Sequence, residues 1–405
     1  MNRKRWLAAA AVALLAIPIV GSAGIYAALG GFGGPLKPAE AEAKLEAMLR
    51  DVVANNKAVR NGVLRVEAPA LGVSGAWAAG VADERSGAAM TENTPFLSAS
   101  VGKLFTAATV LALAEEGVLS LDDDVTMWLE PEVYAGLPAA GGDAALTEVT
   151  IRRLLSQRSG LPDYFEGKTA DGSPNLQKLL TLEPDRVWTP LELLDYTKEH
   201  FAPAGAPGEV FTYSDTNYDL LGLIVEAATG QPFHAVVEAK ILQPLGLRDT
   251  WYYSHTNPPQ PDLAPYADVW LGDINSARTP VLSLDWAGGG LATTTADLNT
   301  MLRSLAAGKP VALEAFQAEW TENAVAPGLD YGYSLWRIRP DGLFFLLRGY
   351  PNLYGASGST GSFLYWAPEY DAVISGAFNQ MEYTQNSIMF LVRVLIVLGR
   401  VEAQG

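Results

Sequence analysis

Residues 97–105 read LSASVGKLF, which places Ser100 three residues before Lys103. No other lysine in the chain has a serine at this spacing. Side chains at positions i and i+3 of a helix share one face, so the Lys103 amine should reach the Ser100 hydroxyl. The spacing therefore predicts a nucleophile beside its base.

The segment after this pair, residues 105–114, is apolar all round and is expected to form a helix that runs through the core. Burial disfavours a charged amine and would lower the pKa of Lys103, so that a neutral lysine could take a proton from Ser100. The simpler alternative is a serine helix cap followed by a lysine that faces solvent.

The amino-acid composition excludes several classes of function. The chain has 405 residues, a net charge of −17 and no cysteine. Disulfides, thiol catalysis and cysteine–metal sites are therefore excluded, and such an acidic surface argues against a nucleic-acid partner. The only histidines are His200, His234 and His255, and no Gly-x-Ser-x-Gly motif accompanies them. A Ser-His-Asp hydrolase thus lacks a supported base.

The N-terminus predicts export. A basic stretch at residues 1–5 precedes the uncharged, mostly apolar residues 6–30. This run also reaches the ~20 residues that span a bilayer, so residues 1–30 are a signal peptide or a membrane anchor. Residues 31–38 read as a flexible linker. The expected location is periplasmic, extracellular or on the outer face of the cytoplasmic membrane.

The remaining chain predicts an α+β fold in two domains. Residues 39–118 and 286–400 are expected to form a sheet domain, and residues 119–285 an inserted, mostly helical domain. Strands are expected at 63–67, 73–81, 331–338, 343–347, 361–366 and 372–379, and a terminal helix at 388–398 should cover the sheet. The aromatic, proline-rich residues 251–270 could form a wall over a cleft.

Two further motifs offer the partners that a serine nucleophile needs. Tyr213-Ser214-Asp215 precedes a predicted helix, and its tyrosine could exchange protons. Residues 355–363 form a glycine- and serine-rich run beside a strand, where a free backbone N–H could bond a carbonyl oxygen. Taken alone, the first motif more often holds a packed or exposed tyrosine, and the second is better explained by a flexible hairpin turn.

The three motifs together resemble the signatures of the serine β-lactamase and D-Ala-D-Ala carboxypeptidase superfamily. The most similar branch holds the class C β-lactamases, related DD-carboxypeptidases and family VIII esterases. Connecting segments at residues 115–123, 153–162 and 244–247 match as well, so the resemblance covers roughly residues 40–400. It implies a β-lactamase/transpeptidase-like fold, with an antiparallel sheet flanked by helices and an inserted helical domain.

The resemblance also implies roles for single residues. Ser100 would be acylated, Lys103 would be its base or proton partner, and Tyr213 the general base and acid. The backbone N–H groups of Ser100 and Ser359 would form the oxyanion hole. Asp215, Ser357 and Gly358 would contact the substrate, and no metal or cofactor is needed.

Two positions depart from the family pattern. Asp215 stands where asparagine is common, and Ala356 stands where lysine or histidine precedes the Ser-Gly pair. Alanine cannot hold a substrate carboxylate, although Arg348 could replace that contact. We therefore expect an exported serine hydrolase, an esterase or amidase acting on a small-molecule or peptide substrate. The alternatives are a D-Ala-D-Ala carboxypeptidase, as in penicillin-binding proteins, and a non-catalytic module that binds cell-wall peptide.

Overall fold

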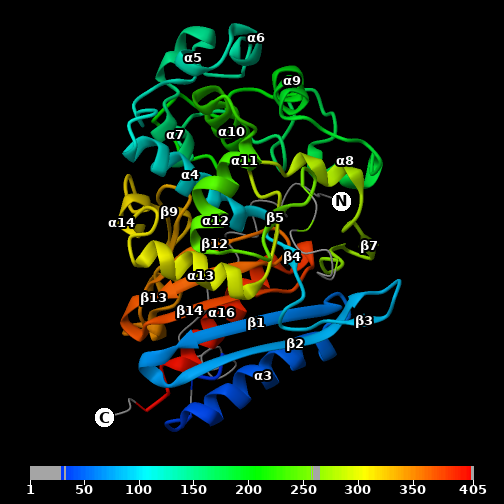
Figure 1. Cartoon of the computed structure of the whole chain (residues 1–405), viewed down its shortest axis with the longest axis vertical. Coiled ribbons are helices and arrows are strands. Elements are labelled where there is room, and N and C mark those ends of the chain that lie inside the picture. Colours follow the sequence, from blue (N-terminus) through cyan, green and yellow to red (C-terminus); the bar gives the residue numbers. More distant parts are fainter. Residues whose placement is uncertain (1–28, 32, 257, 259–264, 403–405) are drawn as a thin grey trace.

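The structure is a computed structural model that describes residues 29–31, 33–256, 258 and 265–402 (Figure 1). The predicted export segment lies almost entirely outside the described residues, as does part of the aromatic segment 251–270. Within the described linker, the Arg400 guanidinium donates hydrogen bonds to the Gly30 and Gly34 carbonyl oxygens. The Leu36 N–H donates to Arg400 O at 2.7 Å. The described part of the predicted linker is therefore hydrogen-bonded to the C-terminal segment, and its flexibility stays a prediction.

A nine-stranded antiparallel sheet forms one half of the molecule, and its strands come from both ends of the chain (Figure 1). Its order is β3 (Ala88–Ala89), β2 (Val73–Asp83), β1 (Asn61–Ala68), β14 (Ala372–Ala377), β13 (Phe363–Ala367), β12 (Leu353–Ser357), β11 (Trp336–Ile338), β10 (Leu329–Tyr331) and β9 (Thr321–Ala326). The predicted antiparallel pairing of the first two long strands is confirmed, with Leu64 opposite Trp77.

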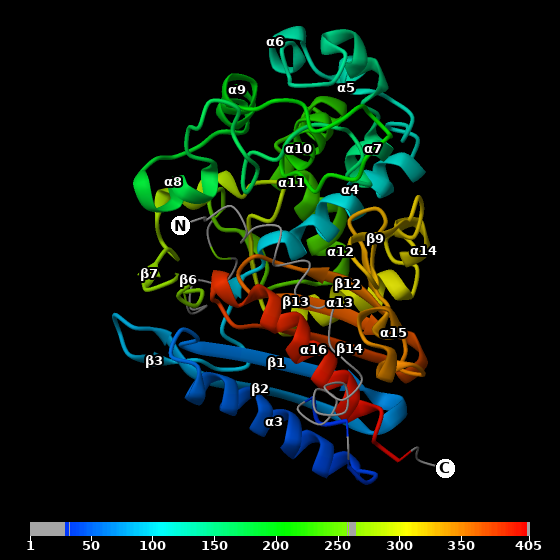
Figure 2. The same ribbon diagram turned by 180° about the vertical axis from the view of Figure 1, so that it is seen from behind.

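Helices cover both faces of this sheet. Successive side chains of a strand point to opposite faces, so each face packs against its own set of helices. Leu364 and Val373 join the core on the side of α13 (Thr295–Ala306), whereas Tyr365 and Ile374 face the opposite side. That second face is covered by α3 (Pro38–Asn55) and α16 (Thr384–Leu398) (Figure 2). The predicted antiparallel sheet flanked by helices is therefore confirmed.

The terminal helix also passes a test of length and composition for crossing a membrane. Residues Met381–Leu398 have a mean hydropathy of 1.2, and the bent pair Thr216–Thr229 and Phe233–Leu245 passes when taken together. Half of the Met381–Leu398 window is buried inside the protein. Phe390, Leu391 and Val394 pack against the sheet, so the apolar character of α16 is accounted for by the core.

Helices predominate between the first strands and α13. They are α4 (Lys103–Glu115), α5 (Val125–Trp128), α6 (Pro131–Tyr134), α7 (Ile151–Leu155), α8 (Leu176–Leu182), α9 (Pro190–His200), α10 (Thr216–Thr229), α11 (Phe233–Val237) and α12 (Gln243–Leu245). Helix α9 has an N-terminal cap, because the Thr189 hydroxyl accepts a hydrogen bond from the Glu192 N–H at 3.3 Å. Helix α4 is buried along its length, as its composition predicts.

Small sheets and short helices complete the chain. A three-stranded sheet has the order β4 (Phe96–Leu97), β8 (Leu291–Thr293) and β5 (Trp251–Tyr252), and β6 (Trp270–Leu271) pairs with β7 (Ile274–Asn275). The short helices are α14 (Leu313–Phe316) and α15 (Pro340–Leu343).

Two strand predictions differ from the structure. Residues 343–347 are helical turns, because Pro340 begins α15 and Leu347 packs beside α16. The segment 331–338 divides into β10 and β11 at a reversal where Ser334 has a φ of 57°. Strands β9 and β12 were not predicted.

Candidate active site

Ser100 lies in a short 3₁₀ turn, Ala99–Gly102, that leads directly into α4. Ala99 has a φ of 45°, a left-handed conformation that costs an L-residue roughly 1–2 kcal/mol. The turn is also crowded, since a Cβ on Gly289 would lie 2.3 Å from the Ala99 carbonyl oxygen. The backbone before Ser100 is thus held in an unusual conformation by a close approach of glycine.

Lys103 is the first residue of α4 and is almost fully buried, with 1% of its surface exposed. Its Nζ donates to Ser100 Oγ at 3.1 Å, to Gly288 O at 2.9 Å and to the Asp215 carboxylate. The predicted Ser–Lys contact is therefore present. All three ammonium protons have acceptors, so the lysine is fixed in one position.

The charge of Lys103 differs from the expectation. Burial lowers the pKa of Lys103 and is the largest single effect. The charges of nearby acidic groups, with Asp215 first among them, and the hydrogen bond to Asp215 together outweigh it, so the pKa lies above its usual range. The expectation of a neutral lysine is wrong because it considers burial alone, whereas Asp215 pairs with the buried ammonium group. An asparagine at position 215 would not have this effect.

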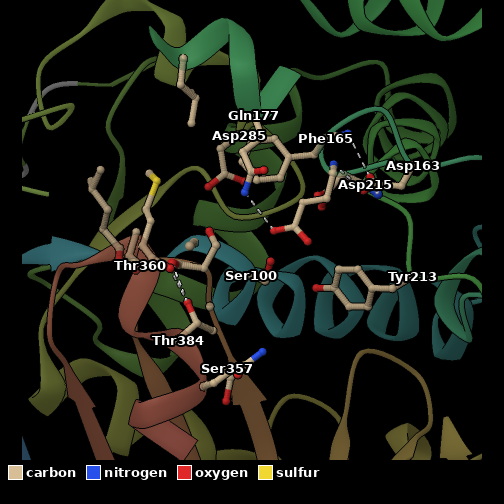
Figure 3. Close-up of a pocket in the computed structure, with 18 of the residues that line it drawn as sticks. Ser100, Asp163, Phe165, Gln177, Tyr213, Asp215, Asp285, Ser357, Thr360 and Thr384 are labelled. Atoms are coloured by element: carbon tan, nitrogen blue, oxygen red, sulfur yellow. Dashed lines mark hydrogen bonds between the residues drawn. The ribbon is translucent and has the colours of Figure 1, made fainter. Parts of the chain in front are cut away.

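Tyr213 lies just before α10 and faces Ser100 (Figure 3). Its ring stacks on Trp336 at a centroid distance of 6.1 Å and meets the Tyr331 ring edge-on at 6.0 Å. Burial raises the pKa of Tyr213 well above the usual value, although the Lys103 charge and a hydrogen bond with Ser100 act in the opposite direction. The phenol is therefore protonated at neutral pH.

The loop that carries Tyr213 is held by the segment that follows α7. The Pro162 carbonyl oxygen accepts hydrogen bonds from the Ser214 and Thr216 hydroxyls at 2.8 and 2.7 Å. The Asp163 carboxylate accepts from the Asp215 N–H at 3.0 Å. Residues 159–162 belong to a segment that matches the family in sequence, and in the structure Pro162 helps to position the Tyr213 loop.

The glycine- and serine-rich run is hydrogen-bonded to the backbone just before Ser100. The Ser362 hydroxyl donates to Ser98 O at 2.6 Å, and the Thr360 hydroxyl donates to Leu97 O at 3.1 Å. A Cβ on Gly358 would lie 2.6 Å from the same Ser98 oxygen, so the approach requires glycine. The Ser359 N–H has no acceptor among the described residues. It is therefore free to bond a substrate oxygen.

Ala356 and Arg348 do not supply a substrate contact. Ala356 is 2% exposed and belongs to the core between the sheet and the helices. Arg348 is exposed and does not line the pocket. The suggestion that Arg348 replaces the missing lysine or histidine is therefore wrong, because its position after α15 is away from Ser100.

A cavity of about 540 Å³ opens in front of Ser100. All the remaining predicted site residues, Tyr213, Asp215, Ser357, Gly358 and Ser359, line it, whereas Lys103 lies behind Ser100. Figure 3 shows Ser100 between Asp285 on one side and Ser357 on the other. The Ser357 hydroxyl forms a hydrogen bond with the Tyr365 hydroxyl at 3.0 Å.

Several acidic residues of this pocket were not predicted from the sequence. Asp163, Glu166, Asp285 and Glu382 line it together with Asp215. Burial raises the pKa of Asp163 to about 7, with a further contribution from the charge of Asp215. Burial also raises the pKa of Asp285 to about 7, against the attraction of Lys103. Asp163 directly follows Pro162, and Asp285 directly precedes Trp286. No sequence motif marks either position as part of a site.

The aromatic segment contributes less than expected. Tyr253 lines the pocket, but Trp251 and Trp270 are buried at 4% and 5% exposure and do not line it. The histidines lie elsewhere: the His200 ring is hydrogen-bonded to Asp171, and His234 stacks on His255 at 5.7 Å. In the described part of the chain, no histidine lines the pocket that contains Ser100.

Comparison with known proteins places this site in a family. The family model named Beta-lactamase matches residues 41–393, which include all three motifs. The chain belongs to the β-lactamase family. It is 37% identical over 198 residues to esterase EstB of Burkholderia gladioli, a match covering 47% of this chain and 46% of that protein. It is 30% identical over 196 residues to penicillin-binding protein 4* of Bacillus subtilis (strain 168), covering 47% and 38%. These matches thus span less than half the length of either relative.

Solved structures extend the fold comparison over most of the chain. The D-amino acid amidase of Ochrobactrum anthropi SV3 superposes with a TM-score of 0.71 at 24% identity, covering 89% of this chain and 98% of that one. The hydrolase EstCE1 superposes with a TM-score of 0.70 at 20% identity, covering 88% and 98%. At these identities the likeness establishes the fold, which is the β-lactamase-like fold predicted from the motifs.

Proposed function

We propose that the protein is an exported serine hydrolase that cleaves an ester or amide through an acyl-enzyme on Ser100. The observation that carries the proposal is the 3.1 Å hydrogen bond from Lys103 Nζ to Ser100 Oγ at the wall of a 540 Å³ cavity. A hydroxyl is a weak nucleophile until a neighbouring group takes its proton. Lys103 and Tyr213 both reach the Ser100 hydroxyl, and Tyr213 keeps its own proton at neutral pH, so Lys103 is the group that takes the proton.

The first step moves two protons. Because Lys103 is charged, it must give a proton to Asp215 as it takes the Ser100 proton. The Ser100 oxygen then bonds to the substrate carbonyl carbon, and the carbonyl oxygen becomes an oxyanion. Asp215 makes this transfer feasible, since a carboxylate can accept a proton and an asparagine amide cannot.

The second step expels the leaving group. The backbone N–H groups of Ser100 and Ser359 stabilise the oxyanion, and the Tyr213 hydroxyl donates its proton to the departing oxygen or nitrogen. The bond between the carbonyl carbon and the leaving group breaks, and the proton held by the Lys103–Asp215 pair returns to Tyr213. Water then attacks the acyl-enzyme by the same groups in reverse order and releases the acid.

The substrate is a small molecule or peptide without a terminal carboxylate. The acidic pocket and the buried Ala356 support the absence of a carboxylate. The similar proteins include an esterase, a D-amino acid amidase and a penicillin-binding protein by name, which supports a small molecule or peptide. A panel of p-nitrophenyl acyl esters, D-Ala-D-Ala peptides and nitrocefin tests the proposal. Ester or amide hydrolysis that Ser100→Ala abolishes supports it, whereas preference for the D-Ala-D-Ala peptide would favour the carboxypeptidase alternative.

Export is proposed from residues 1–30 and is tested separately. Cell fractionation of the full chain should recover the protein outside the cytoplasm, with residues 6–30 either removed or acting as a membrane tether. Intact mass distinguishes these two outcomes. Recovery from the cytoplasm with the complete N-terminus would contradict the proposal.

A further inference from the structure

The charged side chains that line the pocket are all acidic. Its lining includes Asp163, Glu166, Asp215, Asp285 and Glu382, and no lysine, arginine or histidine of the described residues lines it. Lys103 supplies one positive charge from behind Ser100 and is already paired with Asp215. The remaining carboxylates have no cation to balance them inside the pocket. A substrate that brought a positive charge would supply one.

Asp285 is the most directly available of these carboxylates. It is partly buried, it lines the pocket, and none of the described residues donates a hydrogen bond to its carboxylate. It also lies near the reacting groups: a Cβ on Gly288 would be 3.5 Å from Asp285 Oδ1 and 3.5 Å from Lys103 Nζ. A buried carboxylate without a donor is costly, so it favours a ligand that can donate to it.

Glu166 provides a second carboxylate on the same side of the pocket. Its Oε1 accepts a weak hydrogen bond of 3.4 Å from the Gln177 amide, which leaves the other oxygen free to bind a donor. Figure 3 shows Gln177, Phe165 and Asp285 grouped together, on the other side of Ser100 from Ser357. The oxyanion donor Ser359 lies with Ser357, so the acidic side would face a substituent of the acyl group.

Apolar residues form the rest of this region. Leu97, Leu180, Leu282 and Leu284 line the pocket and belong to one buried cluster beneath it. An aliphatic or aromatic substituent would be removed from water against these side chains. The cavity that contains Ser100 therefore has both carboxylates that can bind a cationic group and an apolar surface.

We propose that the enzyme is specific for esters or amides of amino acids or short peptides that have a free ammonium group beside the scissile carbonyl and an apolar side chain. In this assignment Asp285 and Glu166 recognise the ammonium group. The inference rests on the proposed serine hydrolase function and names its substrate class. It also disfavours the carboxylate-bearing substrates of β-lactamases, because the charged side chains that line this pocket are all acidic.

Matched substrates test this inference. The probes are phenylalanine methyl ester and p-nitroanilide, as both enantiomers, and the 3-phenylpropionyl analogues, which have hydrogen in place of the ammonium group. N-succinylphenylalanine p-nitroanilide replaces the ammonium group by a neutral amide whose succinyl chain ends in a carboxylate. We expect kcat/KM to be at least about tenfold higher for one ammonium enantiomer than for the neutral analogue, and lowest for the anion. Equal or higher kcat/KM for the neutral analogue in both series would overturn the inference.

Variants identify the recognising residues. Asp285→Asn and Glu166→Gln should each lower the ratio of ammonium to neutral kcat/KM at least about threefold. The matched controls Asp185→Asn and Glu92→Gln change exposed acids that do not line the pocket and should keep the wild-type ratio. Glu166 is exposed at the pocket mouth, so its variant is expected to fold even if Asp285→Asn does not. A ratio unchanged in the folded variants would overturn the assignment.

The two proposals fail in distinguishable ways. If Ser100→Ala hydrolyses all substrates like the wild type, the serine hydrolase function is wrong. If Ser100→Ala is inactive but the neutral analogue is preferred, only the substrate class is wrong. If no substrate is turned over, protection of Ser100 from a fluorophosphonate probe by phenylalaninamide is compared with protection by 3-phenylpropanamide. Equal protection would again overturn the ammonium specificity.

Discussion

The ammonium group of Lys103 donates a hydrogen bond to the carboxylate of Asp215, next to the hydroxyl of Ser100. The side chains of this ion pair are only 2% and 15% exposed. The pair keeps Lys103 charged in a place where burial alone would favour the neutral amine. It also provides a carboxylate that can receive the Ser100 proton through the lysine.

This pairing predicts strong coupling in stability. Removing one partner of a buried ion pair leaves an unpaired charge and typically costs about 3–5 kcal/mol, whereas removing both often costs little. Lys103→Met and Asp215→Asn should therefore each lower the free energy of unfolding by about 3 kcal/mol. The double variant should be more stable than either single one. Urea unfolding measures all four proteins, and additive losses would contradict the coupling.

Tyr213→Phe tests the proton donor. The ring should keep its packing on Trp336, because only the hydroxyl is removed. We expect kcat to fall at least tenfold, since general acid–base catalysis typically contributes ~10²–10⁴. The free energy of unfolding should be close to that of the wild type, which separates a catalytic from a structural effect. An unchanged kcat would remove Tyr213 from the mechanism.

Gly358→Ala tests the oxyanion hole. The new methyl group would lie 2.6 Å from Ser98 O and 3.0 Å from the Ala99 Cβ, so the strand end must move away from Ser100. Loss of one oxyanion donor costs about 10²–10³ in kcat. We expect a fall of about a hundredfold, close to that range. Gly34→Ala is the control, because a Cβ there meets nothing within 4 Å. Equal activity of the two variants would show that catalysis does not need the close approach of Gly358 to the backbone before Ser100.

Asp285 should make stability depend on pH. Burial raises its pKa to about 7 in the folded state, so the folded protein retains a proton that the unfolded chain loses near pH 4. Its contribution to stability is therefore complete below pH ~4 and is lost as pH rises through about 7. The melting temperature should fall between pH ~5 and ~8, and less steeply in Asp285→Asn, where Asp163 still contributes. Asp185→Asn should keep the wild-type slope, and an equal slope in Asp285→Asn would contradict the assignment.

Much of the fold could be predicted from local patterns. The amphipathic helix α3, the buried helix α4 and the β1–β2 pair follow from the spacing of apolar residues and the turns between them. Strand β12 could not be read in this way, because its Gly355-Ala356 sequence has low strand propensity and is held by pairing with β11 and β13. The neighbouring strands decide its structure.

The site was predictable where residues are near in sequence and uncertain where they are distant. Ser100 and Lys103 are three residues apart, so their contact follows from helix geometry. Asp285 approaches Lys103 and Asp163 approaches Asp215 only after the chain has folded, and no local motif marks either residue. The charge of Lys103 was mispredicted for the same reason, since it depends on Asp215, which is 112 residues away.

The central claim is that Ser100 forms a covalent intermediate. The most direct measurement is labelling with a fluorophosphonate probe, followed by intact mass and peptide mapping of the wild type and Ser100→Ala. The account predicts one adduct per wild-type chain, located on Ser100, and none in the variant. Equal labelling of both proteins, or of neither, would contradict the assignment of Ser100 as the nucleophile.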